Sequence, residues 1–213
     1  MTPELVLYIL GAILLILLIA YICFYKQVNL FIVTITGKKR IQKKLYKGCK
    51  TNDFLIINDI YLPIAENKYK HIDTIIFGNK FIYITRQISQ IGDIKVSLDD
   101  LKWRVINNSN LTIIDNPFLY NKKVINYLVD IVDGLQHNDL KNLVVVSKAC
   151  SLSNTTKFEN EMIVSENDAI KAIVEYEKKS NEDIIDPIEI ERYCDAFYQQ
   201  GLIAEKIINN KGK

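Results

Sequence analysis

The sequence predicts an α/β domain with a mixed β-sheet, preceded by one transmembrane helix. Three observations predict this class. Residues 5–25 form an uncharged apolar run, residues 71–86 form two apolar segments around a Gly-Asn turn, and later apolar residues recur at helical spacing between further strand-like runs. In a chain of 213 residues, this leaves room for one compact domain after the anchor.

The anchor is predicted over residues 5–25, LVLYILGAILLILLIAYICFY. At about 1.5 Å per helical residue, such a run spans roughly the 30 Å hydrocarbon core of a bilayer. Only Met-Thr-Pro-Glu precedes it, whereas cations and no acidic residue occupy residues 26–50. The sequence therefore predicts a single-pass protein of the cell membrane, with the N-terminus outside and the C-terminal domain cytoplasmic. A cleaved signal peptide is disfavoured, because no basic segment precedes the run and no small-x-small site closes it.

Charge is divided unevenly along the chain. Residues 1–50 contain eight basic residues and one acidic residue, and residues 51–213 have a net charge of −5. Basic residues beside the inner leaflet attract anionic lipid head groups by about 1 kcal/mol each, or they only set the orientation of the anchor. The acidic remainder disfavours a general nucleic-acid binder. The candidate lipid-facing cations are Lys26, Lys38, Lys39, Arg40, Lys43, Lys44 and Lys47.

The first elements of the domain are predicted from apolar period and from turn residues. Residues 37–48 place Ile41 and Leu45 four positions apart between two glycines, which predicts a short amphipathic helix with Gly48 as its C-cap. Strand-like apolar runs follow, and Pro63 is expected to stop the first of them. The predicted strands cover residues 54–62, 71–77, 80–86, 91–96, 111–114, 143–146 and 162–164.

Turn and capping residues connect these runs. Gly78-Asn79 predicts an antiparallel hairpin, and Asn116-Pro117 predicts the start of a helix. Ser165-x-x-Asp168 predicts a capped helix that ends near Tyr176, and Asp186-Pro187 predicts the start of the last helix. Together these elements predict strands and helices in one mixed α/β domain.

Cysteine and histidine usage predicts neither a disulfide framework nor a zinc site. The four cysteines lie far apart without a C-x-x-C pair, and His71 and His137 have no second ligand at metal-binding spacing. No cofactor is expected from these residues.

Several of these positions, in this order, resemble the nuclease-related domain (NERD) family of the restriction-endonuclease-like PD-(D/E)xK superfamily. The resemblance runs from about Gly37 to Cys150. It implies a restriction-endonuclease-like mixed β-sheet flanked by helices. Together with the predicted anchor, it divides the chain into three parts: residues 1–33 are the anchor and basic juxtamembrane start, residues 34–150 are the NERD-like domain, and residues 151–213 are a C-terminal strand and helix extension. The positions that carry it are Gly37 with Ile41 and Leu45, residues 58–63, 71–76 and 80–84, Gly92, Trp103 and Asn116-Pro117.

The resemblance also implies where a nuclease site would lie. The family uses a carboxylate on the first helix, an Asp on the first hairpin strand and Glu-x-Lys on the second strand, with Mg or Mn bound by the carboxylates. These positions correspond to Lys38, Asp73, Thr85 and Gln87, so Asp73 alone matches. A hydroxyl and an amide do not replace a carboxylate and an ammonium group. The resemblance therefore implies a catalytically inactive, NERD-like binding or scaffold module.

Two other interpretations stay open. Asp93-Ile-Lys95 reads D-x-K, so a metal-dependent, membrane-tethered nuclease could use Asp73, Asp93 and Lys95 with Mg or Mn. Against it, Gly92 matches the family glycine that follows the Glu-x-Lys strand, which places Asp93 and Lys95 on the next strand. The third interpretation is a membrane-surface assembly factor that binds anionic lipid through residues 26–50. Expected partners are the lipid bilayer, anionic lipid head groups and an unidentified protein, and nucleic acid is not favoured.

Overall fold

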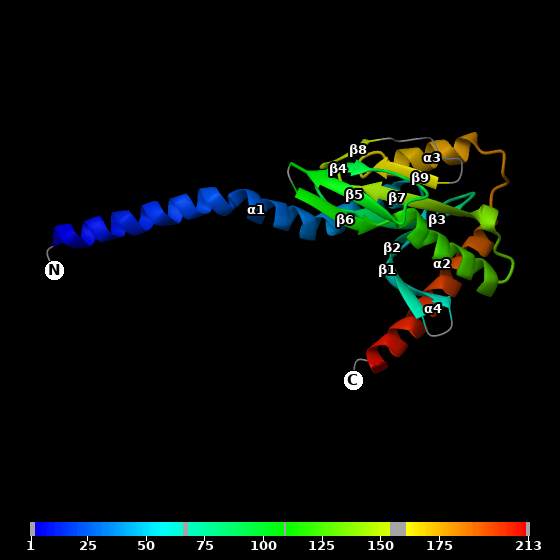
Figure 1. Ribbon diagram of the computed structural model, residues 1–213. Coiled ribbons are helices and arrows are strands. Elements are labelled where there is room, and N and C mark those ends of the chain that lie inside the picture. The colour runs from blue at the N-terminus through cyan, green and yellow to red at the C-terminus, as the bar shows by residue number, and fades with distance from the viewer. Residues whose placement is uncertain (1–2, 66–67, 109, 154–160, 212–213) are drawn as a thin grey trace.

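The computed structural model describes residues 3–65, 68–108, 110–153 and 161–211. These residues form an α/β structure with two β-sheets and five helices, of which one is a short 3-10 helix (Figure 1). The predicted α/β class with mixed strand directions is therefore confirmed.

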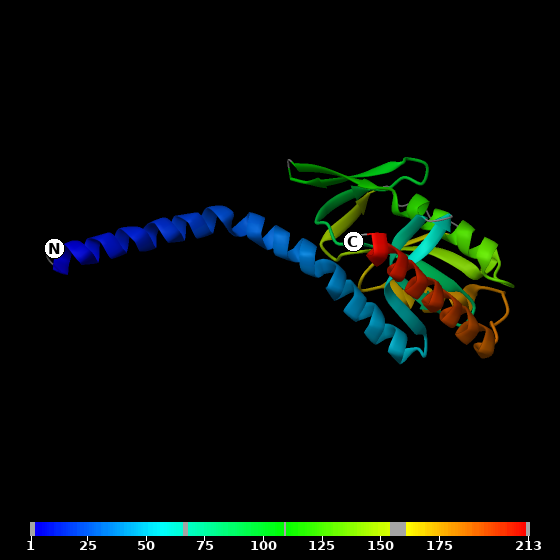
Figure 2. The same cartoon turned by 90° about the horizontal axis from the view of Figure 1, so that it is seen from below.

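Helix α1 (Pro3–Thr51) is one continuous helix. Its first part projects away from the domain, and its last part packs against the domain (Figures 1 and 2). Within the part of the chain that the structure describes, no helix combines the length and the apolar character needed to cross a membrane. The side chains of residues 5–9, 22–24 and Lys26, which belong to the predicted anchor and its basic flank, lie outside the described residues.

Two glycines of the predicted helix 37–48 serve packing. The predicted ends of that helix are wrong, because α1 continues through Gly37 and Gly48. A Cβ atom on Gly37 would lie 2.6 Å from Cβ of Ser89, and one on Gly48 would lie 2.4 Å from Cγ1 of Ile170. Glycine is required at both positions because α1 approaches its neighbours so closely there.

The larger sheet has the strand order β1-β2-β3-β7-β9. Its strands are β1 (Leu55–Ala65), β2 (Lys68–Phe77), β3 (Ile82–Ile88), β7 (Leu140–Val146) and β9 (Glu161–Ser165). The first three pair antiparallel and the last three pair parallel. The predicted hairpin is confirmed, with Phe77 opposite Ile82. The predicted stop at Pro63 is wrong: β1 is an edge strand, where a missing N–H is tolerated, and Pro63 lies opposite Tyr69.

The smaller sheet has the strand order β6-β5-β4-β8. Its strands are β4 (Gly92–Lys95), β5 (Lys102–Asn107), β6 (Asn110–Asp115) and β8 (Cys150–Ser153). Strand β5 was not predicted, although buried Trp103 and Val105 alternate with exposed Lys102 and Arg104. The ring of Trp103 packs edge-on against Phe118, with 5.5 Å between ring centroids. The β5–β6 hairpin projects from the domain on the side toward which α1 extends (Figure 2).

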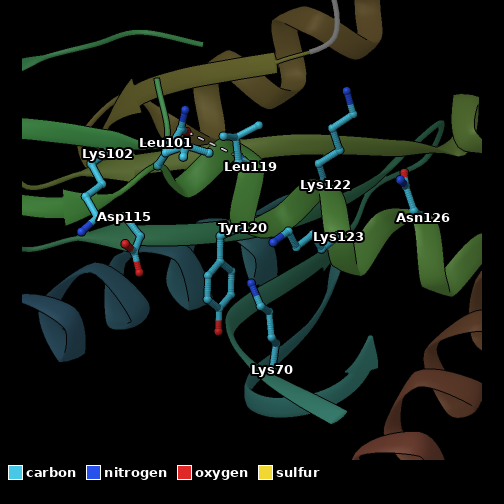
Figure 3. A pocket seen from close by; sticks show the side chains of 10 residues that line it. Lys70, Leu101, Lys102, Asp115, Leu119, Tyr120, Lys122, Lys123 and Asn126 are labelled. Carbon is cyan, nitrogen blue, oxygen red and sulfur yellow. Dashed lines mark hydrogen bonds between the residues drawn. The ribbon is translucent and has the colours of Figure 1, made fainter. Parts of the chain in front are cut away.

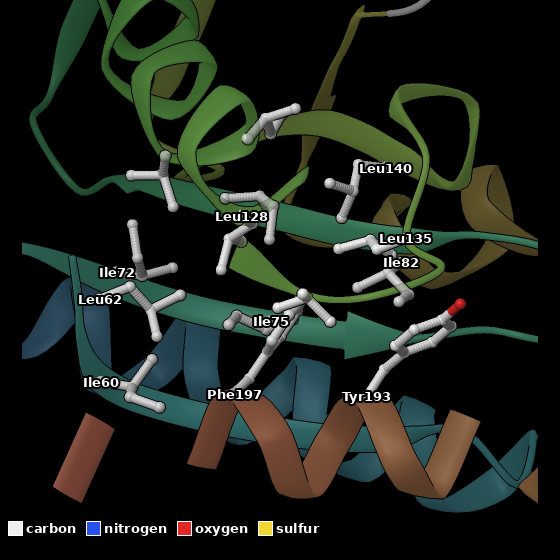
Figure 4. Packing of buried hydrophobic residues seen from close by; sticks show 14 of the residues in the cluster. Ile60, Leu62, Ile72, Ile75, Ile82, Leu128, Leu135, Leu140, Tyr193 and Phe197 are labelled. Carbon is white, nitrogen blue, oxygen red and sulfur yellow. The ribbon is translucent and has the colours of Figure 1, made fainter. Parts of the chain in front are cut away.

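Helices cover both faces of the larger sheet. They include α2 (Pro117–Ile131), η1 (His137–Asp139), α3 (Ala169–Lys179) and α4 (Pro187–Lys211). Side chains of α2 and α4 pack on one face, where Leu128 and Phe197 meet Ile75 (Figure 4). The last part of α1 and α3 pack on the other face, where Ile41 and Ile173 belong to one core cluster. Residues 151–213 therefore contribute strands to both sheets and two covering helices.

The start of α2 is fixed as the sequence predicted. Asn116 is the N-cap, and its side-chain oxygen accepts hydrogen bonds from the backbone N–H groups of Phe118 at 2.9 Å and Leu119 at 3.4 Å. Its side-chain amide donates to the carbonyls of residues 97, 98 and 100. These bonds tie the first turn of α2, which carries Tyr120, to the loop before β5.

Candidate functional site

The site is built around a carboxylate on β2. Asp73 is completely buried, and Lys38 Nζ of α1 lies 2.8 Å from its Oδ1. Arg86 Nη1 of β3 lies 3.3 Å from Oδ2, and His71 Nδ1 lies 3.6 Å from Oδ1. The backbone N–H of Gln87 donates to Oδ2 at 2.8 Å. We call Lys38, His71, Asp73, Arg86 and Gln87 the Asp73 cluster.

Local structure explains why these residues meet. Strands β2 and β3 are antiparallel neighbours with Thr74 opposite Thr85, which brings Arg86 next to Asp73. Helix α1 reaches the same point because Gly37 lets its backbone approach Ser89. The Lys38 side chain then extends from the next residue of the helix to the carboxylate.

The other two family positions are held by internal hydrogen bonds. Thr85 is buried, and its Oγ1 donates to the carbonyl of Tyr83 at 3.4 Å. Gln87 is buried too, and its Nε2 donates to Oγ1 of Thr74 at 2.8 Å. Gln87 Oε1 is buried without a hydrogen-bond partner among the described residues. Neither side chain extends a carboxylate or an ammonium group toward Asp73.

The Asp73 cluster does not fit a divalent metal ion. Mg and Mn need several oxygen ligands, and the only carboxylate in the cluster already accepts a backbone N–H and contacts two cations. A metal would have to displace the ammonium group of Lys38. Among the described residues, no group of three or more His, Cys, Asp or Glu side chains could hold a metal ion.

The alternative D-x-K residues lie on the other sheet. Asp93 and Lys95 belong to β4, and both are exposed. Asp93 accepts a hydrogen bond from Ser151 of the neighbouring strand β8. Lys95 lines a shallow hollow together with Arg104. The structure thus places Asp93 and Lys95 on one sheet and Asp73 inside the other.

The predicted lipid-facing segment divides into two groups. Arg40 and Lys44 point to the domain, where both bind the carboxylate of Glu166, and Lys38 points to Asp73. The exposed group lies at intervals of four residues, on one face of the helix. It consists of Lys39, Lys43 and Lys47. Lys26 lies outside the described side chains.

One hollow adjoins the Asp73 cluster, and a second hollow adjoins the first. A pocket of about 240 Å³ is lined by Lys38, Arg86 and Gln87, together with Asp115 and Tyr120. A larger groove of about 570 Å³ shares Asp115 and Tyr120 with it. We call this larger hollow the Tyr120 groove (Figure 3). The basic residues that line the groove are Lys70, Lys102, Lys122 and Lys123.

Tyr120 stands where the two hollows meet. Its hydroxyl donates to the carbonyl of His71 at 2.9 Å. Two cations lie against its ring: Lys70 Nζ is 3.7 Å from the ring centroid and Arg86 Cζ is 4.3 Å from it. Burial lowers the pKa of Lys70, and the positive charges of Lys123 and Arg86 lower it further. Burial also raises the pKa of Tyr120. Several positive charges thus lie close together at Tyr120.

Sequence reasoning missed Arg86, Tyr120 and the groove lysines. One signal was present: Tyr120 and Lys123 lie three residues apart after a helix start, so they share a helix face. Arg86 had no such signal, because its role depends on the pairing of β3 with β2. The position of Lys70 could not be predicted either, because Lys70 lies near the start of β2, far from the predicted turn at Gly78-Asn79.

Comparison with known proteins gives no relative for this chain. No family model matches it, and neither does any curated protein or solved structure. The function is therefore inferred from the residues and the geometry of the site.

Proposed function

We propose that this protein is a membrane-anchored NERD-like protein whose cytoplasmic domain lacks nuclease activity and acts as a binding or scaffold module. One observation carries the proposal. The ammonium group of Lys38 lies 2.8 Å from Asp73, on the helix position where the family has a carboxylate for its metal. A built-in cation thus supplies the positive charge that a nuclease takes from Mg or Mn.

The arrangement of strands supports the restriction-endonuclease-like part of the proposal. Asp73 lies on one hairpin strand, Thr85 and Gln87 lie on the next, and α1 brings residue 38 to them. This is the arrangement that the resemblance implies for the family site. The replacements at residues 38, 85 and 87 remove two of its three acidic ligands and its lysine, so catalysis is expected to be lost.

The anchor is supported by the uncharged run in the first part of α1. The described side chains from Leu10 to Tyr21 are exposed except for Ala20, which is partly exposed, and Leu14 reaches 72%. Large apolar side chains that no protein surface covers gain about 25 cal/mol per Å² when hydrocarbon replaces water around them. A bilayer is the environment that would cover all sides of such a helix at once.

The distance along α1 argues against lipid binding as the main role of residues 26–50. At about 1.5 Å per residue, Lys39 lies roughly 21 Å beyond residue 25 along the helix. This exceeds the Debye length of about 8 Å at physiological salt, so its attraction to a leaflet would be screened if the helix stands upright. The exposed Lys39, Lys43 and Lys47 then remain free to contact a protein partner.

A nuclease assay tests the proposed loss of chemistry. The full chain in a non-ionic detergent is incubated with single-stranded and double-stranded DNA and RNA in Mg or Mn. We expect the unchanged protein to show no cleavage that the Asp73→Ala variant lacks. Cleavage that is equal in the two samples would come from a contaminant. Cleavage that Asp73→Ala, Asp93→Ala or Lys95→Ala each lowers by about tenfold would establish the migrated nuclease site instead.

Thiol labelling tests the orientation. Cys49 and Cys150 are poor reporters, because burial raises the pKa of Cys49 to about 12 and that of Cys150 to about 11. Lys179→Cys, at an exposed position on α3, should resist a membrane-impermeant reagent in intact cells and react after lysis. Labelling in intact cells would reverse the orientation.

Membrane extraction tests the anchor itself. Changing Leu15→Arg and Leu18→Arg together places two charges in the apolar run, each costing about 2.5–3.5 kcal/mol at a helix centre. The variant should be released by carbonate, whereas the unchanged protein should resist it. A variant that still resists carbonate would refute the transmembrane anchor.

A further inference from the structure

We propose that the Tyr120 groove binds a small soluble anion that carries two or more phosphate groups. This deepens the proposed function, because it rests on the domain being a binding module and names the class of ligand. The groove lies among α2, the start of β2 and the paired ends of β5 and β6 (Figure 3). It is open to solvent and adjoins the smaller pocket beside the Asp73 cluster.

The lining of the groove carries an excess of positive charge. Four of its ten lining residues are lysines, and Asp115 is the only acidic one among them. The ion pairs between described side chains use other cations and leave these four lysines out. The groove lysines therefore have ammonium donors available for an anion, and phosphate oxygens accept such charge-assisted hydrogen bonds.

The crowding of cations around Tyr120 also favours an anionic ligand, because the carboxylate of Asp115 offsets only part of the repulsion at Lys70. Lys70 and Arg86 both lie against one aromatic ring, and Lys123 stands close enough to lower the pKa of Lys70. Each cation gains from the ring, yet the cations repel one another. Arg86 uses Nη1 toward Asp73 and the His71 carbonyl, and it lines the smaller pocket that adjoins the groove. A phosphate in the groove, beside Lys70 and Lys123, would relieve the repulsion.

The geometry favours a small phosphorylated anion over nucleic acid. Lys70 and Arg86 lie against the Tyr120 ring, so it offers a base little stacking surface, and the Trp103 ring is buried. The net charge of −5 on residues 51–213 also limits positive charge to local patches. A groove of about 570 Å³ fits a compact anion with two or three phosphates.

The same geometry favours a soluble anion over a lipid head group. Tyr120 lies on α2, in the domain from which the first part of α1 projects away. Residue 37, where α1 packs against Ser89, is about 18 Å past residue 25 along the helix. A head group in an upright arrangement would not reach the groove. Vesicle binding therefore separates the two sources of phosphate.

Tripolyphosphate is the probe for the test. The full chain in non-ionic detergent is titrated with it by calorimetry at about 150 mM salt, where surface attraction is largely screened. We expect saturable binding that Lys70→Gln with Lys123→Gln weakens about tenfold or more. Lys70→Arg with Lys123→Arg should keep most of the affinity, because it keeps the charge. The charge-matched control, Lys148→Gln with Lys171→Gln at exposed positions, should change it less than about twofold.

Several results would overturn the inference. These are an absence of saturable binding, an equal loss in the groove and control variants, and groove-dependent binding of only a short oligonucleotide or only phosphatidylglycerol vesicles. Fluorescence of Trp103, the single tryptophan, checks that each variant is folded. Cleavage of nucleic acid is measured separately, so a nuclease activity would refute the proposed function without touching the anion site.

Discussion

Two buried carboxylates receive cations from the same stretch of α1, and the cations of one of them, Asp73, line a pocket. Asp73 is bound by Lys38 from α1 and by Arg86 from β3. Glu166, just after β9, is bound by Arg40 Nε at 3.2 Å and by Lys44 Nζ at 2.9 Å. Both carboxylates are completely buried, so each needs its cations.

The two clusters differ in how the cations use their remaining donors. Around Glu166, Arg40 Nη2 donates to Oγ of Ser147 at 2.8 Å, and Lys44 donates to Oδ1 of Asn167 at 2.6 Å. Around Asp73, Lys38 and Arg86 line the pocket of about 240 Å³. The same pairing therefore fastens α1 to the domain at Glu166 and also presents charge to a hollow at Asp73.

The largest effect is expected at Asp73. Asp73→Ala leaves Lys38 and Arg86 without a paired carboxylate and the backbone N–H of Gln87 unbonded. Losing one partner of a buried pair costs roughly 3–5 kcal/mol, and partial exposure of the cations reduces this to about 3 kcal/mol here. The free energy of unfolding, measured from Trp103 fluorescence in urea, should fall accordingly. A loss below about 1 kcal/mol would contradict the buried pair.

A smaller loss is expected at Glu166. Glu166→Ala should reduce the free energy of unfolding by about 2 kcal/mol, because Arg40 and Lys44 can turn to water. Amide hydrogen exchange should also rise in the last part of α1, which this carboxylate fastens to the domain. Glu175→Ala is the control, since Glu175 is exposed on α3 and its pair with Lys171 is worth about 0.5 kcal/mol or less. Equal losses of stability in Glu166→Ala and Glu175→Ala would show that Glu166 does not fasten α1 to the domain.

The comparison also shows what the sequence could predict. Apolar period and turn residues predicted most elements of the domain, including the hairpin and the start of α2, because these signals are local. Strand β5 was missed because its signal is a short alternation around Trp103. The ends of the helix over residues 37–48 were wrong because glycine at 37 and 48 serves close packing, which depends on distant segments.

The candidate site was predicted in part for the same reason. Asp73 and residues 38, 85 and 87 were named through the resemblance, and the structure brings Lys38 to Asp73. The contribution of Arg86 depends on strand pairing, and the groove depends on the meeting of three separate segments. Likewise, no local pattern could separate Lys38 and Lys44, which point inward, from Lys39, which stays exposed.

A charge-neutral variant at each carboxylate sharpens the difference between the clusters. Asp73→Asn removes negative charge beside the pocket, so tripolyphosphate affinity should rise about threefold to tenfold, provided that the variant stays folded. Glu166→Gln removes the same charge from the cluster around Glu166 and should change the tripolyphosphate affinity by less than about twofold. Calorimetry of both variants measures the contrast. A similar rise in both would mean that only net charge matters.

A third buried carboxylate, which no cation pairs with among the described residues, gives the smallest expected effect. Glu177 of α3 accepts backbone N–H bonds from Asn79 at 3.2 Å and Lys80 at 3.4 Å, and the hydroxyl of Tyr83 lies 3.3 Å from its Oε1. Burial raises the pKa of Glu177, and these hydrogen bonds offset only part of that rise. Without a paired cation, this carboxylate holds a proton more tightly in the folded state than in the unfolded chain.

The pH dependence of stability follows from this raised pKa. Stabilisation by the bound proton is fully present below the pKa of the unfolded chain, and it is lost as the pH rises through the higher pKa of the folded state. Glu177→Gln cannot titrate, so the free energy of unfolding should fall less steeply with rising pH. Urea unfolding from pH 4 to neutrality measures the slope, with Glu175→Gln as the control on the same helix. An unchanged slope in Glu177→Gln would show that the hydrogen bonds to this carboxylate fully replace a cation.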